Sequence, residues 1–153
     1  MNRAFVLAAL LLSFFFSTSS AWAQEEPPPP RPTEDLYGDW NFDLNKFVAF
    51  MEENNEEFKN MPQEYKDKFL DVMSKISFEF DEDEVTMTVD DEDTDADFWV
   101  ISKDADIWTV ETQEEGKSKK ERGTIEWLGD DSICFIDDIS ASKPNRFFLQ
   151  RED

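Results

Sequence analysis

The stretch from Ile76 to Arg151 decides the fold, because it is a series of short apolar segments rich in β-branched and aromatic residues. The segments are Ile76-Ser-Phe-Glu-Phe80, Val85-Thr-Met-Thr-Val89, Phe98-Trp-Val-Ile101, Ile107-Trp-Thr-Val110, Thr124-Ile-Glu-Trp-Leu128, Ser132-Ile-Cys-Phe-Ile136 and Arg146-Phe-Phe-Leu-Gln-Arg151. Acidic turns, or turns containing Gly, Asn and Lys, separate them, and no helical pattern lies between them. Such a series is typical of an antiparallel barrel or sandwich and not of βαβ units.

Alternation within these segments predicts which side chains share a face. In the first segment Ile76, Phe78 and Phe80 point one way, while Ser77 and Glu79 point the other. The segment 85–89 repeats this pattern, so the early strands have one dry and one wet face. The segments 98–101 and 107–110 are apolar on both faces. We therefore expect helices, a second copy of the chain or a ligand to cover their second face.

A further strand and a helical region precede this series. Trp40 and Phe42 alternate with polar residues, and Asp43 is a suitable N-cap for a helix that follows. From 44 to 75 the apolar period changes to about 3.6, with interruptions at 54–55 and 60–62. The sequence therefore predicts a mainly β fold: an antiparallel up-and-down barrel of about eight strands, with two short helices inserted after the first strand. The helices are expected to close one end or cover one face; the alternative is a partner-binding helix.

The N-terminal residues have the features of an export signal. Arg3 precedes an apolar run, 4–16, and Ala21-Trp-Ala23 has the small-x-small form of a cleavage site. The run is shorter than the roughly 20 residues that a membrane-spanning helix needs. We expect residues 1–23 to be a signal peptide cleaved after Ala23, 24–35 a proline-rich linker, and 36–153 the barrel domain. The mature protein is then periplasmic or secreted, with no membrane span.

The charge of the chain limits its partners. It has 37 acidic and 15 basic residues, a net charge of −22, which repels nucleic acid and anionic lipid headgroups. The acidic run 90–97 resembles the start of a calcium loop, but Ala96 and Ser102 stand where that loop requires Gly and Glu. We interpret the run as a solvated hairpin turn and predict no metal site, with weak binding of divalent ions as the alternative.

Catalytic patterns are missing from the sequence. It contains no histidine, which is the usual general base near neutral pH and the usual zinc ligand. Cys134, the single cysteine, therefore has no histidine partner, and its apolar segment indicates a buried small side chain. No glycine-rich phosphate loop is present. We therefore expect a protein that is not an enzyme and has no cofactor.

Two separated elements carry a resemblance to a known family. Gly38-Asp-Trp40 lies on the first strand, and Arg151, or else Arg146, lies on the last. Together with the antiparallel strands, this pattern resembles the lipocalins, or the wider calycin group, and most closely small lipocalin-like proteins of the bacterial envelope. The resemblance implies that Trp40 closes the base of the barrel beneath Arg151 through a cation–π contact. Lipocalins place their main helix after the last strand, whereas here the helices follow the first.

The resemblance also implies the function. It predicts a non-catalytic barrel that holds an apolar small molecule, with protein partners left open. The candidate ligand-binding residues are Phe78, Phe80, Met87, Val89, Trp108 and Trp127. Because small barrels are often filled by their own side chains, the alternative is a solid barrel that serves as an interaction or accessory module of the cell envelope.

Overall fold

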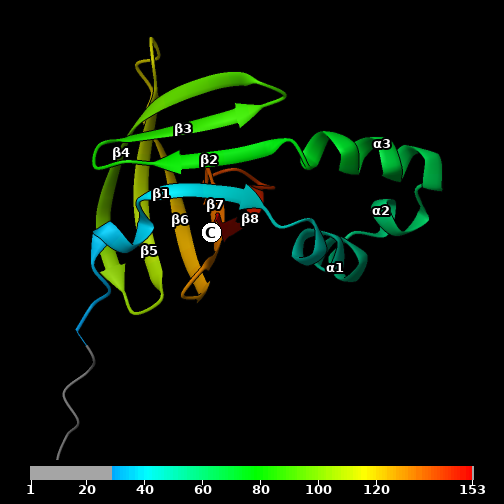
Figure 1. The fold of residues 1–153 in the computed structure, drawn as a ribbon, viewed down its shortest axis with the longest axis horizontal. Coiled ribbons are helices and arrows are strands. Elements are labelled where there is room, and N and C mark those ends of the chain that lie inside the picture. The colour runs from blue at the N-terminus through cyan, green and yellow to red at the C-terminus, as the bar shows by residue number, and fades with distance from the viewer. Residues whose placement is uncertain (1–28, 153) are drawn as a thin grey trace, which may run out of the picture.

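The computed structural model describes residues 29–152, so the predicted signal peptide and the start of the linker lie outside the described residues. Eight strands form one closed barrel in chain order, each antiparallel to its neighbours (Figure 1). They are β1 (Gly38–Phe42), β2 (Ile76–Phe80), β3 (Glu84–Val89), β4 (Glu92–Asp104), β5 (Ile107–Glu114), β6 (Glu121–Gly129), β7 (Ser132–Asp137) and β8 (Asn145–Arg151). The predicted mainly β up-and-down barrel is confirmed.

Alternation places the large apolar side chains inside the barrel. Phe78 on β2 lies opposite Trp40 on β1 and Met87 on β3, so the three share the interior face. On the other face of β2, Glu79 is exposed. Pairing of β1 with β8 closes the ring, with Trp40 opposite Arg151. Closure leaves no unpaired edge strand.

Three helices, and not the predicted two, follow β1. They are α1 (Leu44–Asn54), α2 (Glu56–Asn60) and α3 (Gln63–Met73). The difference arises at Asn55, whose extended backbone ends α1 and whose side chain accepts a hydrogen bond from the Phe58 amide, 2.9 Å away. It thereby caps a short helix that the sequence pattern had not separated. Within residues 29–152, no helix combines the length and the apolar composition needed to cross a bilayer.

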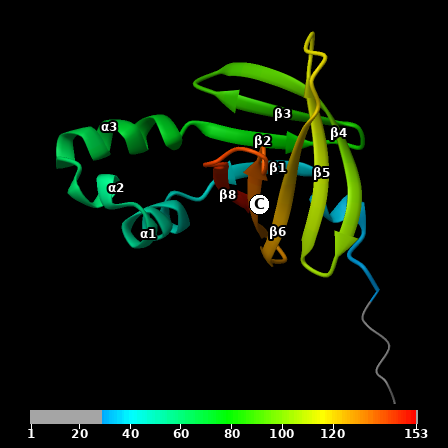
Figure 2. The ribbon, with the colours of Figure 1, turned by 180° about the vertical axis from the view of Figure 1, so that it is seen from behind.

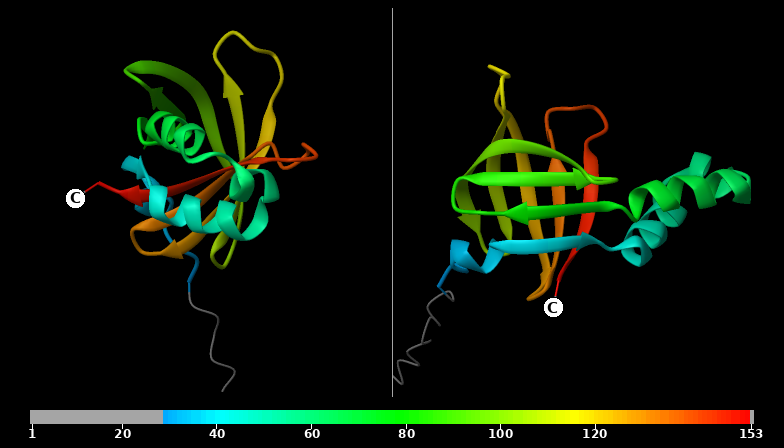
Figure 3. Two further views of the ribbon diagram at one scale, coloured as in Figure 1. Left: turned by 90° about the vertical axis from the view of Figure 1, so that its right-hand side faces the viewer. Right: turned by 45° about the horizontal axis from the view of Figure 1, so that its top comes forward.

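The helices project from one end of the barrel, and the N-terminal segment lies at the other (Figures 2 and 3). A small aromatic core holds them together, because Phe47 of α1 contacts Phe58 and Phe69 at ring-centroid distances of 6.4 and 5.9 Å. Phe50 of α1 lies 5.4 Å from Phe148 of β8. The insertion therefore covers part of the outer face of β8 and continues beyond the end of the barrel.

The strands that are apolar on both faces remain partly uncovered. Ile101 and Ile107 are 49% and 51% exposed, so no described part of the chain covers them. Ile101 is the residue left over where the β4–β5 register shifts between Val100 and Ser102. Trp99 lies under Lys120, whose ammonium nitrogen is 3.9 Å from the ring centroid. A lysine stem thus shields the largest of these outward side chains.

Gly123 provides a test of the barrel packing. A Cβ atom at this position would lie 2.5 Å from the backbone oxygen of Ile136 and 3.3 Å from the Phe135 ring. We expect Gly123→Ala to lower the free energy of unfolding by about 1–3 kcal/mol, because β6 and β7 would have to separate. Gly129→Ala on the same strand is the control, since a Cβ atom there meets nothing within 4 Å. Urea titrations that give equal midpoints for the two variants would contradict this packing.

Candidate functional site

One end of the barrel is sealed by three tryptophans, each covered by a basic side chain. The pairs, which we call the base seal, are Trp40 with Arg151, Trp108 with Lys103 and Trp127 with Arg31, at 4.5, 4.3 and 4.3 Å from cation to ring centroid. The rings also contact one another, since Trp127 lies 6.0 Å from Trp40 and 5.2 Å from Trp108. Indole rings are the best partners for cations, and cation and ring here exclude water from the base together.

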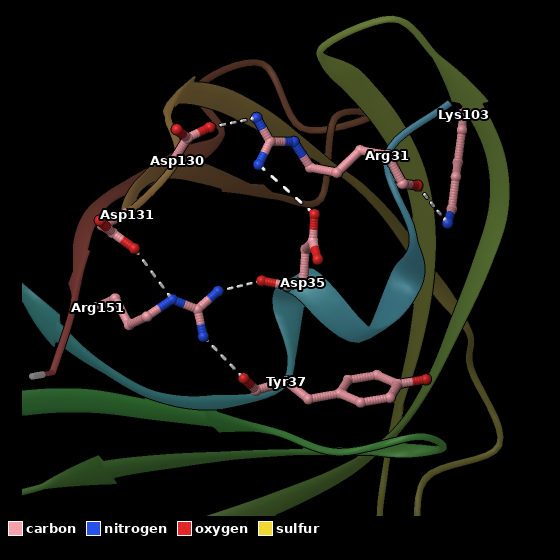
Figure 4. A network of polar contacts seen from close by, with 7 residues as sticks. All are labelled: Arg31, Asp35, Tyr37, Lys103, Asp130, Asp131 and Arg151. Carbon is pink, nitrogen blue, oxygen red and sulfur yellow. Dashed lines mark hydrogen bonds and ion pairs between the residues drawn. The ribbon is translucent and has the colours of Figure 1, made fainter. Parts of the chain in front are cut away.

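Arg151 holds the base seal to the segment before β1. Its guanidinium donates hydrogen bonds to the backbone oxygens of Tyr37, at 2.9 Å, and Asp35, and forms an ion pair with Asp131 at 3.4 Å (Figure 4). The Trp40 indole nitrogen donates to the Leu36 oxygen at 2.8 Å. The short helix η1 (Thr33–Leu36) is therefore fixed across this end of the barrel.

Arg31 and Thr33, which the sequence predicted to belong to the linker, also contact the base of the barrel. Arg31 forms ion pairs with Asp130 at 3.0 Å and with Asp35 at 3.7 Å (Figure 4). Lys103 donates to the Arg31 backbone oxygen at 3.0 Å and to the Thr33 hydroxyl. The part of the linker from Arg31 onward therefore lies against the barrel. It covers the base of the barrel.

The opposite end of the barrel contains a cavity of about 290 Å³, which we call the barrel mouth. Its floor is apolar and is formed by inward side chains of β2, β3, β7 and β8. These are Phe78, Val85, Met87, Phe135 and Phe147. The Phe147 ring lies 5.2 Å from Phe78 and 6.1 Å from Phe135, so the floor is a packed aromatic surface. A molecule resting there would lose most of its contact with water.

Charged side chains surround the barrel mouth. Glu114, Glu121 and Asp137 come from three neighbouring strands, and Lys117 and Lys119 come from the loop between β5 and β6. Lys117 pairs with Glu114, and Lys119 pairs with Glu121 at 3.2 Å. Burial, and then the charge of Glu121, raises the pKa of Asp137 above its usual range. The rim can therefore contact a polar or charged group at the outer end of an apolar ligand.

Of the six predicted ligand-binding residues, two line the barrel mouth and four do not. Phe78 and Met87 line the barrel mouth. Trp108 and Trp127 belong to the base seal, and Phe80 is fully buried beside Phe98 with ring centroids 5.4 Å apart. Val89 packs against the core from β3 but does not line the cavity. The predicted partners Trp40 and Arg151 lie in contact at the base.

Sequence reasoning missed Phe135, Phe147 and the charged rim. The segment 132–136 is apolar on both faces, and Phe147 and Phe148 are adjacent, so alternation within either segment could not orient them. A signal was nevertheless present in β8. Because Arg151 was assigned to the interior, a period of two also places Leu149 and Phe147 there. The lysines of the rim lie in a loop and have no such periodicity.

A second, larger cavity lies between the helices and the loop that precedes β8. We call it the helix groove; its volume is about 860 Å³. Phe50 and Met51 of α1 and Phe69 and Met73 of α3 form its apolar wall, and Lys143 and Arg146 also line it. Phe147 lines both the helix groove and the barrel mouth. The two cavities are therefore neighbours at the same end of the barrel.

The single thiol lies outside both cavities. Cys134 is buried on β7, on the face that does not point into the barrel, where it pairs with Phe148. Burial, and then the nearby Glu126 charge, raises its pKa to about 11. Because the thiolate is the nucleophilic form, the thiol is unreactive near neutral pH.

The acidic run 90–97 forms a hairpin. Asp90 and Asp91 make the turn with positive φ angles of 52° and 68°. Asp93 and Asp95 accept hydrogen bonds from Thr88 and Thr86 across the β3–β4 ladder at 2.7 and 2.9 Å. In the part of the chain that the structure describes, no three acidic or cysteine side chains are grouped to hold a metal ion. The run therefore serves the strand pairing.

Substituting Arg151 tests the base seal. We expect Arg151→Gln to lower the free energy of unfolding by about 2–3 kcal/mol, because two backbone oxygens lose a charged donor and Trp40 loses its cation. Arg122→Gln is the control: this arginine is 57% exposed and has one ion pair, with Glu111 at 2.8 Å. Its loss should cost about 0–1 kcal/mol. Urea unfolding followed by tryptophan fluorescence measures both, and equal costs would argue against the seal.

Asp137 and Asp138 should have opposite effects on stability. The raised pKa of Asp137 means that its charged form destabilises the fold, so Asp137→Asn should increase the free energy of unfolding at pH 7. A hydrogen bond from Ser140 lowers the pKa of Asp138, so Asp138→Asn should decrease it. The Asp137 difference should shrink as the pH falls toward about 4, because its raised folded-state pKa lies above the value in the unfolded chain. The Asp138 difference should persist to about pH 4 and be lost only below it, because its folded-state pKa is lowered. Urea titrations at pH 7 and 4 that show the same sign for both variants would refute this assignment.

Comparisons with known proteins add no family to this description. No family model matches the chain, and neither a curated protein nor a solved structure is significantly similar to it.

Proposed function

We propose that this chain is an exported, non-catalytic barrel that binds a small apolar molecule in the barrel mouth, with a polar group of that molecule at the charged rim. One observation carries the proposal. The barrel is sealed at its base by tryptophan–cation pairs, while its other end has a cavity with an apolar floor. A barrel that only had to be stable could be filled along its whole length.

The size and lining of the barrel mouth define the ligand class. A volume of about 290 Å³ is near the lower limit of small-molecule sites in proteins. Each methylene group of a ligand that leaves water for the floor around Phe78 and Phe147 contributes about 0.8 kcal/mol. The paired charges of Glu114 with Lys117 and Glu121 with Lys119 are available to a polar end group. These features favour a compact amphipathic molecule.

The proposal assigns no catalysis because the barrel mouth offers no evident general base or nucleophile. The sequence contains no histidine, and Cys134 is buried outside the cavity with a raised pKa. Two of the three rim carboxylates, Glu114 and Glu121, already form ion pairs with lysines. The proposal therefore assigns binding, not turnover, to the barrel mouth, and requires no cofactor.

We also propose that the protein is exported and that its barrel is lipocalin-like. The apolar run 4–16 and the small residues Ala21 and Ala23 support a cleaved signal peptide, and hence a periplasmic or secreted protein. The closed eight-stranded barrel agrees with a calycin-like architecture. The contact between Trp40 and Arg151 supports the finer likeness to lipocalins. The net charge of −22 disfavours nucleic acid as a partner.

A second candidate function is supported by the filled part of the barrel and by the exposed helices. Trp40, Trp108 and Phe80 occupy the half nearer the base completely. On α3, Tyr65 and Val72 are 61% and 51% exposed, which provides apolar surface for another protein. The barrel would then be an interaction or accessory module of the cell envelope, and the barrel mouth would remain unoccupied.

Native mass spectrometry separates these functions. The exported protein is purified from its own compartment and weighed before and after denaturation. A non-covalent mass excess that disappears on denaturation supports a carried ligand and gives its mass. A bare chain mass that stays unchanged when extracts of small apolar molecules are added argues for the interaction module.

Filling the barrel mouth should abolish binding there. We expect Met87→Trp to remove the mass excess, because the larger side chain occupies the floor of a cavity of only about 290 Å³. Since the added ring enters existing space, stability should change by less than about 1.5 kcal/mol. Ile107→Trp is the control, because Ile107 is exposed at the start of β5, at the end opposite the mouth. Retained ligand in Met87→Trp, or a large loss of stability, would contradict the cavity.

A further inference from the structure

We propose that the helix groove is a second binding site, which takes an anionic amphiphile: a hydrocarbon chain with a carboxylate head group. The hydrocarbon chain lies along the apolar wall formed by α1 and α3. The carboxylate pairs with Lys143 and Arg146, which line the groove from the segment that leads into β8. This site is separate from the barrel mouth and does not depend on the function proposed for it.

The apolar wall is suited to a flexible hydrocarbon chain. Phe50 and Met51 of α1 and Phe69 and Met73 of α3 all line the groove. Phe69 packs against Phe47 and is still 37% exposed. Methionine side chains adapt to apolar ligands of variable shape. A volume of about 860 Å³ lies within the range of ligand sites and greatly exceeds that of the barrel mouth. A chain of many methylene groups can therefore be covered here and not in the mouth.

The charge of the head group follows from the two cations. Among the described residues, neither Lys143 nor Arg146 has a carboxylate oxygen within 4.0 Å, although acidic residues greatly outnumber basic ones in this chain. The guanidinium carbon of Arg146 instead lies 5.5 Å from the Phe50 ring centroid, directly beside the apolar wall. Two cations without anionic partners, next to an apolar surface, are complementary to a carboxylate on a hydrocarbon chain.

The fold brings the apolar wall and the two cations of the helix groove together from distant parts of the sequence. Lys143 and Arg146 come from the segment that leads into β8, whereas the apolar wall comes from the helices inserted after β1. The loop before β8 and the helices lie at the same end of the barrel (Figure 3). The groove is also lined by Glu56 and Glu57 at the start of α2; Glu56 is paired with Lys59 at 2.9 Å, and among the described residues Glu57 forms no ion pair. The head group is therefore assigned to the part of the groove formed by Lys143 and Arg146, away from α2 in sequence.

Binding of defined probes tests the head group. The protein without its signal peptide is titrated by calorimetry with dodecanoate, dodecanol and dodecyltrimethylammonium at 0.15 M salt, where charges beyond about 8 Å are screened. We expect dodecanoate to bind at least about tenfold more tightly than the cationic probe, a ratio equivalent to one charge-assisted contact. Equal affinity for dodecanoate and dodecyltrimethylammonium would overturn the proposal.

A charge-reversal pair locates the site. We expect Lys143→Glu combined with Arg146→Glu to weaken dodecanoate about tenfold or more and to leave dodecanol unchanged. Lys68→Glu combined with Arg122→Glu is the control, because it makes the same change in net charge at exposed positions whose ion-pair partners, Glu64 and Glu111, lie outside the groove. Circular dichroism verifies that both double variants fold. If the control weakens dodecanoate as much, the effect is general electrostatics and the proposal is wrong.

Methionine methyl groups give a test that needs no substitution. With ¹³C-methyl methionine, dodecanoate should shift the NMR signals of Met51 and Met73 in the groove and leave Met61, which lines neither cavity, unchanged. A shift of Met87 alone would place dodecanoate in the barrel mouth and overturn the groove site while supporting the mouth. Met87→Trp should leave dodecanoate affinity within about twofold. The failure of either site can therefore be distinguished from the failure of the other.

Discussion

The contact between Arg151 and Trp40 is the interaction on which the rest of the structure depends. It joins the last strand to the first, where the barrel must close, and its guanidinium also binds the backbone of the segment before β1. A closed barrel has no strand edge open to other chains, which matters for a protein with so many aromatic strand residues. The seal also has a cost. The buried indole nitrogens of Trp108 and Trp127 have no acceptor within the described chain.

Sealing one end makes the two ends of the barrel chemically different. The tryptophans occupy the base, so the interior left for a ligand lies entirely at the other end, above Phe78 and Met87. The helices also leave and rejoin the barrel at that end, because they follow β1 and precede β2. The barrel mouth and the helix groove are consequently neighbours that share Phe147. Both cavities therefore lie at the end where the barrel is least filled.

The few basic residues have different partners at the two ends of the barrel. At the base, Arg31, Lys103 and Arg151 cover tryptophan rings, and Lys103 and Arg151 also donate hydrogen bonds to backbone oxygens. At the mouth, the lysines of the β5–β6 loop pair with rim carboxylates. In a chain of net charge −22, a cation that lacks such a partner is conspicuous, because attraction to surrounding carboxylates would normally supply one. The cations of the helix groove belong to this small group.

The sequence by itself determined the class of the fold, because a periodicity of two predicted the strands. The contact between Trp40 and Arg151, which closes the ring, was implied by the resemblance to lipocalins. The sequence also placed Phe78 and Met87 on the interior face, because alternation is a local property. Tertiary structure alone decided which interior residues reach the cavity and which fill the base, since depth in the barrel depends on register between strands far apart in the chain. Phe135, Phe147 and the rim charges were therefore found only in the structure. The helix groove has the same origin, because its apolar wall and its cations are separated by most of the barrel in sequence and meet only when the ring closes.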